Sequence, residues 1–124
     1  MRAIRIPLLV LLIVLCFTLW NTAYVTDRCD EWIAALDDVT AALDGGSAGA
    51  GELDALDTLW QAQQGYLHTV VSHTELDEAE ALLAQAKVLS RRGDTQSLYP
   101  VLAQLRHQFR LIAETQQVSP KNIF

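Results

Sequence analysis

The sequence predicts an all-α protein, in which an N-terminal transmembrane helix is followed by an antiparallel, up-and-down four-helix bundle. Three observations carry this prediction. Residues 6–26 contain no charge, although Arg2 and Arg5 precede them. Leu and Ala dominate the remainder, and no proline occurs between Pro7 and Pro100, a composition that favours helices. Apolar residues then recur three and four positions apart in four successive segments, which is the spacing of amphipathic helices.

The uncharged stretch, residues 6–26, has the length of a membrane span. As a helix it would be about 31 Å long, close to the thickness of the hydrocarbon core. Trp20 and Tyr24 lie near its end, where aromatic residues commonly anchor a span at the interface. Because two arginines precede it, the positive-inside rule predicts a cytoplasmic N-terminus and an extracytoplasmic remainder. The expected divisions are therefore residues 1–5 in the cytoplasm, a transmembrane helix at 6–26, a helical bundle at 27–117 and a tail at 118–124.

A cleaved signal peptide is the alternative, since a basic start followed by an apolar run is common to both kinds of segment. Signal cleavage requires small residues at positions −1 and −3. Ala23 would serve as the −1 residue, but Asn21 would then occupy −3, directly after Trp20. These flanks favour an uncleaved signal anchor. Cleavage would instead give a secreted helical protein.

Four amphipathic segments follow in order. The first continues from the span without a helix breaker, so one continuous rod is compatible with the sequence, and it ends at the glycine-rich turn 45–51. The second begins after that turn and is interrupted by Gly65, which predicts either a bend or close packing there. The apolar stripes of these two helices are Val25, Cys29, Trp32, Leu36, Val39 and Leu43, and then Leu53, Leu56, Trp60, Gln63, Leu67 and Val70 or Val71.

The third and fourth segments have clear boundary signals. Ser72 and Glu75 form a capping-box pattern at the start of the third, and Gly93 follows its basic last turn. Asp94 or Ser97 caps the fourth. The short connections favour the up-and-down bundle, and a coiled-coil hairpin that dimerises is the structural alternative. The stripes are Leu76, Ala79, Leu83, Ala86 and Ser90, and then Leu98, Leu102, Leu105, Phe109, Ile112 and Gln116.

Charge is distributed unevenly along the chain. Residues 24–80 carry thirteen acidic side chains and one basic side chain, whereas residues 81–124 carry six basic and two acidic ones. The favoured interpretation is that the two halves face each other in one bundle and partly neutralise. The other is that the basic half faces anionic headgroups or an acidic partner. The formal net charge of −6 argues against nucleic acid as a partner.

No pattern in the sequence points to catalysis, to a metal or cofactor, or to a disulfide. His68 and His73 are five positions apart and cannot share a helix face as the pair of a helical zinc site does. His107 falls off its stripe and is expected to be solvated. Cys16 and Cys29 would lie about 20 Å apart along one helix, so no internal disulfide is expected. For Cys29, an unpaired, partly buried thiol is favoured over a bridge between two copies. The sequence predicts no catalytic, cofactor-binding or metal-binding residue, and no enzyme.

Candidate partner contacts come from tryptophans and from the end of the chain. A tryptophan on a helix stripe is usually a core residue, but tryptophan also dominates interface hot spots. A chain that ends on two apolar residues offers a handle for a partner, unless these residues fold back onto the bundle. The candidate partner-binding residues are therefore Trp32, Trp60, Asn122, Ile123 and Phe124.

Several features stand together in this sequence: an N-terminal span, a small Leu-rich helical domain, Trp60, His73 before an acidic helix start, and the closing Ser-x-x-Asn-Ile-Phe from Ser119 to Phe124. The chain resembles an uncharacterised family of small single-span membrane proteins from spore-forming Gram-positive bacteria and their relatives, known only as a domain of unknown function. The resemblance implies a bacterial cell-membrane location and no assigned activity. It also strengthens the expectation that the last three residues have a defined role.

These observations predict a non-enzymatic, membrane-anchored helical protein. It would act as an accessory or scaffold subunit by binding another envelope or membrane protein, or by self-association. One alternative is an extracytoplasmic sensor that holds a small ligand between its helices. The other is the secreted helical protein that signal cleavage would produce.

Overall fold

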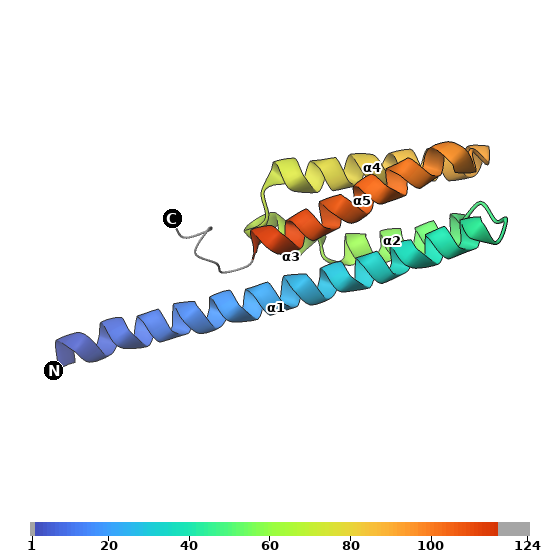
Figure 1. Ribbon diagram of the computed structural model, residues 1–124. Helices are drawn as coiled ribbons and strands as arrows, with labels where there is room; N and C mark the ends of the chain where they lie inside the picture. The colour runs from blue at the N-terminus through green and yellow to red at the C-terminus, as the bar shows by residue number, and fades with distance from the viewer. Residues whose placement is uncertain (1, 117–124) are drawn as a thin grey trace.

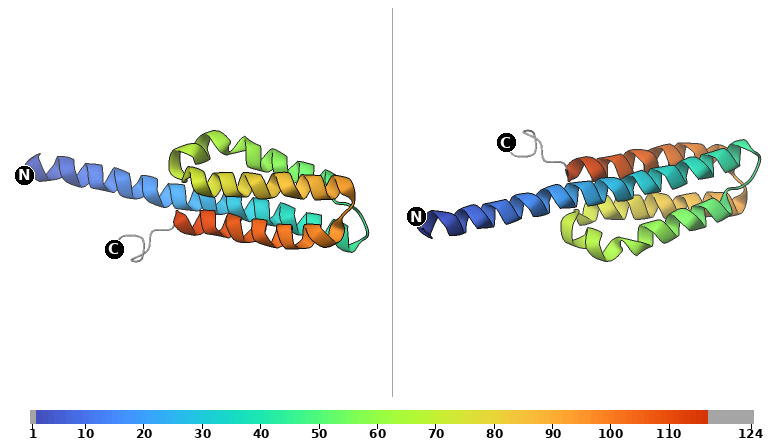
Figure 2. Two further views of the ribbon diagram at one scale, coloured as in Figure 1. Left: turned by 90° about the horizontal axis from the view of Figure 1, so that it is seen from above. Right: turned by 90° about the horizontal axis from the view of Figure 1, so that it is seen from below.

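The computed structural model of the chain describes residues 2–116. In that range the second half of the first helix packs against the second and fifth helices, while its first half projects alone beyond them (Figure 1). The chain reverses direction at the turns between these long helices (Figure 2). The all-α prediction is confirmed for this part of the chain, which contains no strand. Its helices are α1 (Arg2–Asp44), α2 (Ala50–Ala62), α3 (Gln64–Val70), α4 (His73–Arg92) and α5 (Thr95–Thr115).

Helix α1 joins the predicted span and the first amphipathic segment in one unbroken helix of 43 residues. We call residues 3–20 the apolar segment. Its large apolar side chains, from Ile4 to Trp20, are all more than half exposed. From Val25 onward the same helix contributes buried residues to the core. By length and composition, α1 is the one helix among residues 2–116 that could cross a membrane.

The core is built from the predicted stripes. Every residue of the α1 stripe, from Val25 to Leu43, is at most 6% exposed. At the centre, Trp32 of α1, Trp60 of α2 and Phe109 of α5 are each 0% exposed. Their ring centroids lie 4.9 Å apart for the two tryptophans, and 5.2 and 5.6 Å from Phe109. Because each ring comes from a different helix, this cluster ties α1, α2 and α5 together.

Both ends of α4 and the start of α5 lie at the capping residues that the sequence predicts. The Ser72 hydroxyl accepts a bond from the Glu75 backbone N–H at 3.4 Å, as the capping-box pattern predicts. Gly93 ends α4 with a φ of 71°, in the left-handed region that favours glycine. Asp94 is the cap of α5, since its Oδ1 accepts from the Ser97 N–H at 3.2 Å. Of the two residues predicted for that role, Ser97 is thus inside the helix.

The second predicted helix is divided at Gln63 into α2 and α3. The bend that Gly65 predicted is present, two residues earlier. A Cβ atom on Gly65 would meet nothing within 4 Å, so the alternative of close packing at this glycine is wrong. Two side-chain bonds hold the break. The Tyr24 hydroxyl of α1 donates to Gln63 Oε1 at 2.5 Å, and the Gln64 amide donates to the Trp60 carbonyl at 3.2 Å.

The acidic and basic halves of the chain meet in two ion pairs. Lys87 Nζ of α4 lies 2.6 Å from Asp57 Oδ2 of α2, and Arg106 of α5 pairs with Asp37 of α1. The interpretation that the two halves face each other is confirmed at these contacts. Both pairs are partly solvent-exposed, so each contributes at most about 1 kcal/mol to stability.

Cys29 is packed inside this domain as an unpaired thiol, 1% exposed. Burial, reinforced by the neighbouring Asp30 carboxylate, raises the pKa of the thiol from 9.0 to about 12. The folded state therefore holds the thiol proton more tightly than the unfolded state does. The contribution of this group to stability is complete below about pH 9 and is lost as the pH rises towards 12.

We expect Cys29 to resist alkylation by iodoacetamide at pH 8 in the folded chain, because the thiolate is the reactive form and burial prevents its formation. The measurement is mass spectrometry of a Cys16→Ser variant, so that only one thiol is counted. Addition of denaturant should restore full modification. Alkylation of the native chain at the rate of a free thiol would show that α1 is not packed at this position.

Candidate functional site

A cluster of hydrogen-bonded polar and aromatic side chains lies where the apolar segment enters the packed domain. There α1 meets α3 and the end of α5 (Figure 1). We call this cluster the junction. It consists of Trp20, Asn21, Thr22, Tyr24, Gln63, Tyr66 and Gln116.

Hydrogen bonds of two amide side chains, Asn21 and Gln116, link α1, α3 and the end of α5 in the junction. Asn21 Nδ2 donates to Gln116 Oε1 at 2.8 Å, and the Tyr66 hydroxyl donates to Asn21 Oδ1. Gln116 Nε2 in turn donates to the Val70 carbonyl at 3.1 Å. The Thr22 hydroxyl lies 2.5 Å from the Gln116 carbonyl oxygen. Asn21 is only 8% exposed, and a buried amide with its groups bonded in this way fixes the geometry around it.

Aromatic rings cover the network on the side of the apolar segment. Trp20 stacks on Tyr24 with centroids 5.2 Å apart. Tyr66 of α3 meets both rings edge-on, at 6.0 Å from Trp20 and 4.9 Å from Tyr24. Partial burial, followed by the neighbouring Tyr24, raises the pKa of Tyr66 above its usual value of 10.0. Tyr66 is therefore a neutral hydrogen-bond donor at physiological pH.

The junction couples the apolar segment to the packed domain mechanically. Helix α1 runs through it without a break, and the side chains of Gln63, Tyr66 and Gln116 bond to α1 within four residues of Trp20. Any tilt of the segment against the domain would have to break these bonds. The amide, hydroxyl and aromatic groups of the junction can bind neighbouring groups and fix their orientation.

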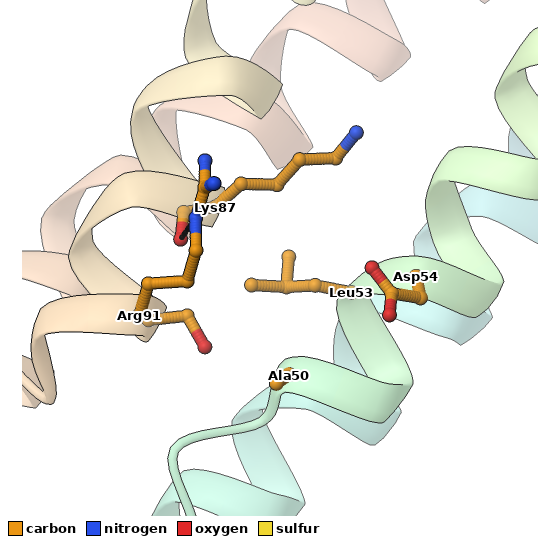
Figure 3. Close-up of a pocket in the computed structure, with 6 residues that line it drawn as sticks. Ala50, Leu53, Asp54, Lys87 and Arg91 are labelled. Atoms are coloured by element: carbon orange, nitrogen blue, oxygen red, sulfur yellow. Dashed lines mark hydrogen bonds between the residues drawn. The ribbon is translucent and has the colours of Figure 1, made fainter.

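A cleft of about 360 Å³ lies between α2 and α4, near the turn that precedes α2 (Figure 3). Lys87 and Arg91 line its α4 side, and Leu53 projects towards it from α2. The Ser90 hydroxyl donates to the Ala48 carbonyl at 2.6 Å, which links α4 to that turn. The cleft is at the small end of the range for ligand pockets. Its lining includes one carboxylate, Asp54, and Lys87 is already paired with Asp57, so Arg91 is the group that suits an anionic ligand.

The structure places the predicted partner-binding residues in two groups. Trp32 and Trp60 are both 0% exposed, which agrees with the core interpretation given for each and leaves neither ring on the surface. Trp60 Nε1 donates to Glu80 Oε1 at 2.5 Å, whereas Trp32 Nε1 has no acceptor among the described residues. The other candidates lie outside the described residues: Asn122, Ile123 and Phe124.

The family model of a domain of unknown function, DUF4363, matches residues 19–123. The chain belongs to this family. The resemblance to an uncharacterised family is thereby confirmed. No curated protein and no solved structure is significantly similar to the chain. The DUF4363 range begins at Leu19, so it contains the junction and helices α2 to α5 but only the last residues of the apolar segment.

The junction of this DUF4363 protein was not predicted as a unit from its sequence. A signal for it exists, because the apolar stripes of α1, α2 and α5 lead into amide side chains at Asn21, Gln63 and Gln116. An amide in a stripe position has to find a buried partner or face water. Tyr66 carried no such signal, since its position depends on the break at Gln63.

The DUF4363 domain also brings His68 and His73 together. Their Nδ1 atoms are 3.3 Å apart, with one residue at the end of α3 and the other at the start of α4. As expected, the two histidines do not share a helix face, but the chain turns between them, so two helices place them side by side. No group of three or more His, Cys, Asp or Glu residues in the described part of the chain is arranged to hold a metal ion.

Proposed function

We propose that this DUF4363 protein is a non-enzymatic accessory or scaffold subunit that binds another membrane or envelope protein. In this proposal residues 6–26 of α1 cross a bacterial cell membrane, with the N-terminus in the cytoplasm. The packed helices then form an antiparallel, up-and-down four-helix bundle on the outer side, in which α2 and α3 together make one of the four.

The two environments of α1 carry the proposal. The exposed apolar side chains from Ile4 to Trp20 form a surface much larger than the patches that soluble monomers expose. The same helix becomes part of a core from Val25 onward. A helix of this kind holds its domain at a fixed height and orientation, because the junction leaves no flexible spacer. That is the arrangement expected of a subunit which presents a surface to a neighbour in the same membrane.

The junction also favours an uncleaved anchor over a secreted product. Cleavage after Ala23 would remove Asn21 and Thr22. The amide of Asn21 bonds to Gln116 and accepts from Tyr66, and Thr22 contacts the end of α5. A secreted form would therefore lose the bonds that close one end of the domain.

Co-purification from native membranes in mild detergent tests the proposal. The full chain, expressed at its native level, is compared with a chain that lacks Asn122, Ile123 and Phe124. A Lys121→Ala variant serves as the control, because it alters the tail but keeps its last three residues. We expect a specific membrane or envelope protein with the full chain and the control, and its loss on truncation. A full chain that purifies alone would refute the proposal.

The cleft between α2 and α4 favours a second candidate function, the binding of a small anionic ligand as part of a sensor. Arg91 would supply the positive charge for the ligand, since Lys87 is paired with Asp57. Thermal-shift screening of the full chain with anionic metabolites distinguishes this function from scaffolding. Stabilisation that Arg91→Gln abolishes supports ligand binding, and the absence of any stabilising compound counts against it.

A further inference from the structure

We propose that α3 lies in the phospholipid headgroup region, at the depth where the apolar segment ends, and that Tyr66 completes an aromatic belt with Trp20 and Tyr24. The inference rests on the proposed membrane anchor. It goes beyond that anchor because it assigns a lipid-contacting surface to the extramembrane domain itself. The occupant of this surface is the headgroup layer of the bilayer.

One face of α1 marks the boundary of the bilayer. Phe17, Trp20, Tyr24 and Arg28 follow one another at spacings of three, four and four residues, so they share a helix face. Neighbouring side chains on this face contact each other. The ring centroids of Phe17 and Trp20 are 6.2 Å apart, and those of Trp20 and Tyr24 are 5.2 Å apart. The Arg28 guanidinium carbon lies 5.2 Å from the centroid of the Tyr24 ring. The face thus changes from apolar to aromatic to charged over about 16 Å of helix, and at its charged end Arg28 pairs with Glu31 at 3.1 Å. This order is typical of the passage from hydrocarbon through the interface to water.

The contacts of Tyr66 fix the depth of α3 relative to this face. Its ring touches both Trp20 and Tyr24, and its hydroxyl donates to Asn21, which lies between them in the sequence. Tyr66 is therefore level with the aromatic stretch of α1, although it is more than forty residues away along the chain. If Trp20 and Tyr24 lie at the interface, α3 lies there as well.

The two sides of α3 fit the headgroup layer better than the hydrocarbon core. Leu67 is 0% exposed and packs into the domain, whereas His68 and Thr69 are exposed on the outside. The Thr69 hydroxyl donates to the Tyr66 carbonyl at 2.6 Å. The imidazole of His68 is of a kind that bonds to phosphate and ester oxygens but is costly to place in hydrocarbon. The domain then rests directly on the bilayer. A protein partner has to approach it from the side or from the opposite end.

Fluorine NMR of the full chain in lipid nanodiscs tests this placement without disturbing the core. The chain has three tyrosines, Tyr24, Tyr66 and Tyr99, which are labelled biosynthetically with 3-fluorotyrosine and assigned by single Tyr→Phe variants. Tyr99 is the internal control, since its hydroxyl donates to Asp44 at 2.6 Å, at the far end of the domain. Twenty residues of helix separate Tyr24 from Asp44, a distance of about 30 Å. The probe is a phosphatidylcholine that carries a nitroxide on its headgroup.

We expect the nitroxide lipid to reduce the signals of Tyr24 and Tyr66 at least twofold and to leave that of Tyr99 unchanged. A Tyr66 signal that behaves like Tyr99, while Tyr24 is reduced, would overturn the placement of α3 and leave the anchor intact. If the Tyr24 signal is also unaffected, the membrane anchor itself is wrong.

Discussion

Phe109→Ala should lower the free energy of unfolding of the packed domain by about 3–5 kcal/mol, the cost of removing a buried phenylalanine ring from a core. The ring is 0% exposed and contacts Trp32 and Trp60. Its removal opens a cavity where α1, α2 and α5 meet. Because domains are stable by only about 5–15 kcal/mol in total, we expect the thermal midpoint to fall by at least about 10 °C.

The fluorescence of the buried tryptophans reports this transition in detergent-solubilised full chain, because their emission shifts to the red when the core opens. Phe17→Ala is the matched control, since it makes the same chemical change at a ring that is 55% exposed in the apolar segment. We expect the control to unfold at the temperature of the unmodified chain. Equal effects of the two substitutions would mean that Phe109 is not a core residue.

The core could be predicted from the sequence because the buried residues of an amphipathic helix recur three and four positions apart. The stripe of α1 could be listed from spacing alone, and all six of its residues are buried. The same holds for Ser72 and Gly93, whose roles depend on neighbours within a few positions. In each case the determining interactions lie within one or two helical turns, so the amino-acid order contains them.

The break at Gln63 and the junction depend on contacts that are distant in sequence. Tyr24 bonds to Gln63 across 39 positions, and Asn21 bonds to Gln116 across 95. Spacing shows which residues are buried but not which stripes face each other. Local propensity therefore predicts the bend at Gly65, whereas the helix is interrupted at Gln63, the residue that bonds to Tyr24 of α1.

The second large effect concerns the apolar segment. Leu11→Lys combined with Val14→Lys should remove the chain from the membrane, because each lysine near the centre of a span costs about 2.5–3.5 kcal/mol of insertion free energy. The packed domain should be unaffected, since both side chains are more than half exposed and none of the buried core residues lies in the apolar segment. The expected product is a folded domain that no longer sediments with membranes.

Alkaline extraction of membranes measures this loss, with Ala34→Lys combined with Ala41→Lys as the matched control. Both alanines are exposed on the same helix, beyond the junction, so the control adds equal charge outside the proposed span. We expect the control and the unmodified chain to stay in the membrane pellet and the Leu11/Val14 variant to leave it. Retention of that variant would show that the packed domain reaches the membrane through contacts of its own or through a partner. In that case the apolar segment of α1 would not be what anchors the packed domain to the membrane.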